Sequence, residues 1–133
     1  MSPHGEARLG PRLRAVFERL LAENVDEEIR DRTWFFLAKI WLQRGYLDKA
    51  QEALYNLSDE LPKNLWREVQ MLQSQIYINS GQYQQAIQLL ENWEGRTEWS
   101  RYAKFNLGVA LVRSGNVEAA KQILNELGDI ERG

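Results

Sequence analysis

The segment WLQRGYLDKA, residues 41–50, contains a pattern that returns twice more along the chain. Its glycine, Gly45, follows an amphipathic stretch and precedes Ala50 by five residues. Gly81 and Gly115 stand in the same setting, at successive intervals of 36 and 34 residues. A fixed period in this range is typical of proteins built from stacked supersecondary units. The sequence therefore predicts a short array of repeated units rather than a single globular core.

Apolar residues between these glycines recur at helical spacing, and no segment alternates with the period of two that a strand requires. Pro11 suits a first helical position, where its missing N–H costs nothing. Asp26 and Thr97 suit N-caps, Gly45 can adopt the left-handed conformation that ends a helix, and Gly128 is expected to end the last one. We predict an all-α chain of about seven helices, at residues 11–22, 27–44, 47–57, 62–80, 83–93, 98–114 and 116–127.

Aligned on their glycines, the three units resemble the tetratricopeptide repeat, a helix–turn–helix motif of 34 residues. The first unit supplies the motif residues Trp34, Leu37, Ala38, Trp41, Gly45, Leu47, Ala50, Leu54 and Pro62. The third supplies Leu107, Gly108, Leu111, Gly115, Val117, Ala120, Leu124 and Leu127, with Lys104 replacing the usual large residue at the fourth position. The middle unit departs most, because Gln70 and Gln73 stand where large residues are expected, although Val69, Leu72 and Ile76 could supply its apolar face. The resemblance implies a right-handed superhelix of helical hairpins.

The same alignment divides the chain. Residues 1–10 are polar and aperiodic and are interpreted as a mobile tail. Residues 11–30 hold an N-terminal helix and the start of the next, and residues 31–133 hold three repeats, at 31–62, 67–98 and 101–130. The first helix is similar to the second helix of a preceding repeat, since Leu13, Val16 and Leu20 lie 34 residues before Leu47, Ala50 and Leu54. We interpret the chain as a piece of a longer array, with residue usage similar to that of bacterial repeat proteins.

Composition argues against several classes of protein. The formal net charge is −2 with both signs interspersed, whereas nucleic-acid binding calls for a basic excess or a basic face. The chain has no cysteine, so it forms no disulfide and has no thiolate. It has no apolar run long enough to span a bilayer and no signal peptide as written. The compartment stays undetermined: cytoplasmic as written, periplasmic if a signal peptide was removed from a longer precursor.

Few residues could carry catalysis. His4 is the only histidine and falls in the predicted tail, whereas a general base must be held in a fixed geometry. The acidic residues at helix starts have a sufficient explanation in the helix dipole, and no phosphate-binding, nucleophile-elbow, zinc-binding or calcium-binding motif is present. We therefore expect no enzyme activity, no cofactor and no metal.

The resemblance also implies a binding site. In this family the concave groove is lined by the second, fifth, ninth, twelfth and thirteenth positions of each repeat. Transferred to this chain, those positions give a predicted protein-binding groove of Phe35, Lys39, Leu42, Gln43, Met71, Gln75, Ile78, Asn79, Tyr102, Phe105, Val109, Val112 and Arg113. The fifth and twelfth positions are apolar in all three repeats, so we expect these six residues to be partly exposed and to form one apolar patch.

The groove residues favour some partners over others. Family members that grip acidic chaperone tails carry lysine at the fifth position, where this chain has Phe35, Met71 and Phe105. The sequence instead predicts a non-catalytic adaptor that holds an apolar or amphipathic protein segment, oriented by Lys39, Arg113 and the groove amides.

Three alternatives remain open at this stage. The chain could be a structural module whose apolar surfaces pair with a second copy of itself. The groove could be filled by the N-terminal segment or by further repeats. RNA binding, as in the related pentatricopeptide repeats, is disfavoured because the predicted groove is apolar rather than basic.

Overall fold

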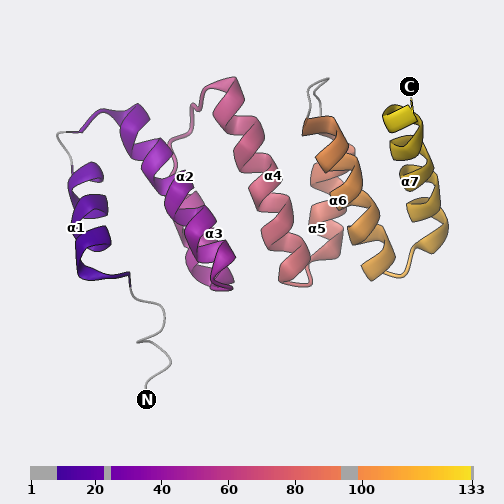
Figure 1. The fold of residues 1–133 in the computed structure, drawn as a ribbon, viewed down its shortest axis with the longest axis horizontal. Helices are drawn as coiled ribbons and strands as arrows, with labels where there is room; N and C mark the ends of the chain where they lie inside the picture. Colours follow the sequence, from indigo (N-terminus) through magenta and orange to yellow (C-terminus); the bar gives the residue numbers. More distant parts are fainter. Residues whose placement is uncertain (1–8, 23–24, 94–98, 133) are drawn as a thin grey trace, which may run out of the picture. The chain divides into compact units, whose positions relative to one another are not determined.

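The computed structural model describes residues 9–22, 25–93 and 99–132. Within these ranges the chain forms seven α-helices and no strand, which confirms the predicted all-α fold (Figure 1). The helices are α1 (Pro11–Leu20), α2 (Glu27–Gln43), α3 (Leu47–Tyr55), α4 (Lys63–Asn79), α5 (Tyr83–Glu91), α6 (Trp99–Arg113) and α7 (Val117–Arg132).

The chain divides into two compact units, Met1–Trp66 and Arg67–Gly133, which we term the N-terminal and C-terminal units. In the N-terminal unit, α2 packs against both α1 and α3. In the C-terminal unit, α6 packs against both α5 and α7. The finer division into repeats at 31–62, 67–98 and 101–130 stays a prediction.

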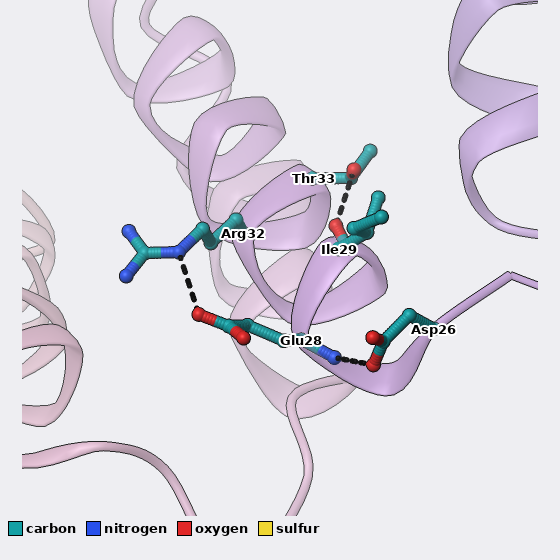
Figure 2. A network of polar contacts seen from close by, with 5 residues as sticks. All are labelled: Asp26, Glu28, Ile29, Arg32 and Thr33. Atoms are coloured by element: carbon teal, nitrogen blue, oxygen red, sulfur yellow. Dashed lines mark hydrogen bonds and ion pairs between the residues drawn. The ribbon is translucent and has the colours of Figure 1, made fainter.

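The start of α2 shows how local sequence fixes a helix boundary. The carboxylate of Asp26 accepts a hydrogen bond of 3.1 Å from the backbone N–H of Glu28 (Figure 2), which satisfies one of the unpaired donors of the first turn. Glu28 also lies 3.6 Å from Nε of Arg32 one turn later, and the hydroxyl of Thr33 donates to the carbonyl oxygen of Ile29 at 2.7 Å. The predicted N-cap at Asp26 is confirmed.

The three glycines of the period end their helices in the same way. Gly45 has a φ of 83°, its N–H donates to the carbonyl of Leu42, and the N–H of Tyr46 donates to the carbonyl of Trp41. This pair of bonds is the Schellman motif, which satisfies the last carbonyls of a helix and requires a left-handed residue. Gly81, with φ 77°, and Gly115, with φ 94°, repeat it. The predicted left-handed helix end at Gly45 is confirmed.

Replacing Gly45 with alanine is expected to cost about 1–2 kcal/mol of stability, the penalty of left-handed backbone for an L-residue. The cost should come from the backbone alone, because no other described residue beyond its chain neighbours has an atom within 4 Å of a Cβ placed there. Gly45→Asn is the matched control, since asparagine tolerates this conformation better than alanine. Urea unfolding followed by circular dichroism measures both variants, and an asparagine variant less stable than the alanine variant would contradict this account.

The prediction that Gly128 ends the last helix is wrong, because α7 continues through it to Arg132. Among the described glycines, only Gly45, Gly81 and Gly115 have positive φ, so Gly128 does not adopt the helix-ending conformation. An interior glycine costs a helix about 1 kcal/mol, which the hydrogen bonds added by further helical residues can offset. The predicted N-cap Thr97, the predicted tail up to residue 8 and His4 lie outside the described residues.

Small side chains let the helices approach closely. Ala38, Ala50, Ser74, Ala86 and Ala120 are each no more than 1% exposed. A Cβ atom added to Gly108 on α6 would lie 3.1 Å from Cδ2 of Leu124 on α7, which is tighter than ordinary van der Waals contact. Interiors packed this closely tolerate little extra volume at such points. The predicted role of the small residues is confirmed at these positions.

Candidate functional site

The predicted groove residues of the N-terminal unit lie on α2. Phe35 and Leu42 are partly buried, whereas Lys39 and Gln43 are exposed. The ammonium nitrogen of Lys39 lies 5.5 Å from the centroid of the Phe35 ring, within the range of a cation–π interaction. This contact joins one predicted apolar anchor to one predicted polar group on the next turn of the helix.

In the C-terminal unit the clearest feature is an exposed row of apolar side chains on α6. Tyr102, Phe105 and Val112 are 59%, 53% and 49% exposed, and Val109 is partly buried. Their spacing of three and four residues places them on one face of the helix. We term these four residues the α6 stripe.

The side of α6 opposite the stripe is also apolar. That side packs into the core of the C-terminal unit, which leaves most of the stripe facing away from the core. Ala103, Leu107, Ala110 and Leu111 are all at most 6% exposed and belong to the core of the C-terminal unit. These residues pack the helix against its neighbours, and of the stripe only Val109 also packs against this core, so Tyr102, Phe105 and Val112 stay exposed. Exposed apolar residues gathered on one helix face typically mark an interaction site.

Two predicted groove residues are not on the surface. Met71 and Ile78 on α4 are 5% and 6% exposed and lie in the core of the C-terminal unit. The side-chain amide nitrogen of Asn106 lies 3.3 Å from the sulfur of Met71, so α6 covers this part of α4. The expectation that all six apolar groove positions form one partly exposed patch is therefore wrong for these two residues.

The structure brings three other predicted residues together around a pocket of about 360 Å³. Gln75 from α4 meets Tyr102 and Phe105 from α6 at this pocket. Asn79 and Arg113, near the ends of α4 and α6, are exposed.

The pocket also has three lining residues that the sequence analysis missed: Arg101, Asn106 and Leu127. Arg101 and Asn106 stand one helical turn from Phe105 and Tyr102 respectively, a spacing that could have identified them. Leu127 comes from α7 and becomes part of the wall only through tertiary packing. The pocket combines aromatic and aliphatic walls with amide and guanidinium groups, as sites for amphipathic ligands do.

In the described part of the chain, no group of three or more histidine, cysteine, aspartate or glutamate residues is placed to hold a metal ion. Nor is any helix in those ranges both long and apolar enough to cross a membrane.

The sequence was compared with protein families, curated proteins and solved structures. Residues 77–133, which include α5, α6 and α7, match the family model described as tetratricopeptide repeat. No curated protein and no solved structure gives a significant match. Repeats of this family generally mediate protein–protein interaction and are generally non-catalytic.

Proposed function

We propose that this chain, whose residues 77–133 match the tetratricopeptide repeat family model, is a non-catalytic adaptor that binds an apolar or amphipathic segment of another protein. The observation that carries the proposal is the α6 stripe. Two aromatic residues more than half exposed, Tyr102 and Phe105, lie on one helix face beside a pocket that they help to line. Aromatic side chains are the residues that most often dominate binding energy at protein interfaces.

In this proposal the stripe supplies the affinity for the bound segment, and polar residues beside it orient that segment. Burial of apolar surface contributes about 25 cal/mol per Å², so a well-buried aromatic anchor contributes about 1.5–3 kcal/mol. Gln75 and Arg113 flank the stripe and are exposed, and they would hydrogen-bond to polar groups of the bound segment. Phe35, Leu42, Lys39 and Gln43 form the corresponding set in the N-terminal unit.

The α6 stripe favours an amphipathic partner over a uniformly acidic one. Its four members carry no charge, and an acidic segment gains little from apolar walls while losing hydration on burial. A helix that presents apolar residues at intervals of three and four would match the stripe's own spacing. Self-association of the chain remains the alternative, because a second copy could cover the same side chains.

We expect Phe105→Glu to weaken binding of such a segment about tenfold or more, equivalent to at least about 1.4 kcal/mol. The glutamate would place a charge at the buried centre of the interface. Peptides selected from a random library against the wild-type chain supply the ligand, and fluorescence anisotropy measures their affinity. Phe105 is a cleaner test than Phe35, because its larger exposure makes loss of the fold less of a concern.

Val117→Glu is the matched control for this test. Val117 is 48% exposed, close to Phe105, but begins α7 and lies outside the stripe. A glutamate in the first turn of a helix is favoured by the helix dipole, so this variant should fold and bind like the wild type. An equal loss of peptide affinity in both variants would contradict the proposal that the stripe is the binding surface. Light scattering of the free protein separates the alternative, since self-association would give a mass above 15.6 kDa.

A further inference from the structure

The fourth position of the third repeat carries a residue of unusual chemistry for that place. The first repeat has Trp34 there and the middle repeat Gln70, whereas the third has the charged Lys104. The ammonium nitrogen of Lys104 forms an ion pair of 2.8 Å with Oε2 of Glu126 on α7. Its side chain is about one-third exposed, and its charged end reaches the surface. At this position the third repeat therefore has a thin aliphatic chain where the first repeat has the larger indole of Trp34.

A hollow of about 320 Å³ lies beside that stem. Besides Lys104, Glu91 and Ser100, the lining is apolar and comes from α5, α6 and α7 and from the residue two positions after α5: Leu90, Trp93, Ala103, Leu107 and Ile123. Its volume is at the lower end of the range for small-ligand sites, about 300–1,000 Å³.

This hollow is separate from the α6 stripe. The α6 residues that line it are Ser100, Ala103, Lys104 and Leu107, whereas the stripe consists of residues 102, 105, 109 and 112. At 3.6 residues per turn, these two sets fall on opposite sides of the helix. The hollow therefore does not depend on the function proposed for the stripe.

The Trp93 ring in the wall has an unusual polar atom. Its indole nitrogen is buried and has no hydrogen-bond partner among the described residues, although buried polar groups nearly always have one. An unpaired buried donor destabilises the folded state. The ring itself packs against the core of the C-terminal unit, which holds it in the wall of the hollow.

We propose that this hollow is a binding site for one aromatic side chain of a protein partner, inserted where the third repeat lacks its own. The first repeat supports the chemistry, because its own polypeptide places an indole at the equivalent position. The walls support it as well, since Leu90, Leu107 and Ile123 offer aliphatic surface to the faces of a ring and Trp93 offers an aromatic one.

Nuclear magnetic resonance of the full chain tests this site. The chain has five tryptophans, and their indole N–H signals are resolved by ¹⁵N labelling, with Trp93→Phe identifying the signal of interest. The probes are N-acetyltryptophan amide, which mimics a side chain on a polypeptide, and free indole. We expect both probes, at millimolar concentrations, to shift the Trp93 signal while leaving the other four nearly unchanged.

Two substitutions at Lys104 make the test specific. Lys104→Trp should fill the hollow from within, raise the melting temperature and abolish the shift. Lys104→Ala removes the same ion pair but leaves the hollow open, so its affinity for both probes should stay within about twofold of the wild type, since an exposed ion pair contributes little. The alanine variant keeps the test valid if the tryptophan variant fails to fold.

Three results would overturn the proposal. No shift of the Trp93 signal with either probe would mean that the hollow does not accept a ring. A shift with free indole alone would mean that the site serves a small molecule rather than a side chain of a partner. If the Lys104→Trp variant bound the probes as strongly as the wild type does, the probes would be binding at a site other than the hollow.

Discussion

Leu111→Ala is expected to lower the free energy of unfolding by about 2–5 kcal/mol, the range for removing a large aliphatic side chain from a packed core. Leu111 is 5% exposed and belongs to the core of the C-terminal unit, together with Leu107 on the same helix. The loss combines the transfer free energy of the deleted atoms with the cost of the cavity left behind. Urea unfolding followed by far-ultraviolet circular dichroism measures it.

The neighbouring residue provides the control for this prediction. Val112 is 49% exposed as part of the α6 stripe, so Val112→Ala should change stability by about 0.5 kcal/mol or less. The two positions differ by one residue and by one hundred degrees around the helix. Similar losses at both would show that the assignment of core and stripe on α6 is incorrect.

Asp31→Ala is expected to cost about 1–3 kcal/mol, because it removes two hydrogen bonds to a carboxylate and leaves the partly buried donors of Ser58 without this acceptor. Asp31 on α2 is 5% exposed. Its two carboxylate oxygens accept hydrogen bonds from the backbone N–H of Ser58 at 3.0 Å and from the hydroxyl of Ser58 at 2.6 Å. Ser58 follows the end of α3. Its hydrogen bonds with Asp31 therefore connect the end of α3 to the start of α2.

A double-mutant cycle with Ser58→Ala isolates the hydroxyl part of this interaction. The double variant should be more stable than the sum of the single losses implies, by about 0.5 kcal/mol or more. Asp31→Asn keeps one acceptor and should lose less than Asp31→Ala. Strict additivity of the two alanine substitutions would indicate that the Ser58 hydroxyl contributes nothing through Asp31.

Much of the fold was predictable from the sequence because its determinants are local. The left-handed glycines, the N-cap at Asp26 and the proline at the start of α1 each act within one turn of helix. The repeat adds a second kind of information, because the positions of buried small residues such as Ala50 and Ala86 follow from the period alone. Gly128 is the exception, since whether a glycine ends a helix depends on the backbone conformation it adopts.

The binding face was less predictable, because exposure depends on neighbours that the sequence does not place. Phe105 and Met71 occupy the same position of successive repeats, yet the first is 53% exposed and the second 5%. Asn106 of α6 contacts Met71, and this contact became visible only when the two helices were placed together. A pattern assigns a residue to a face of its helix, whereas only the packed structure shows whether another helix covers that face.

The helices and the turns between them could be read from the sequence alone, since these depend on residues within a few positions of one another, and the period is visible in the sequence as spaced glycines and alanines. The tertiary structure decided which apolar side chains stay exposed, as in the α6 stripe, and where volume is missing, as beside Lys104. It also revealed the bond between Asp31 and Ser58, 27 residues apart. These features depend on contacts between separate helices, and neither local propensity nor the repeat period specifies such contacts.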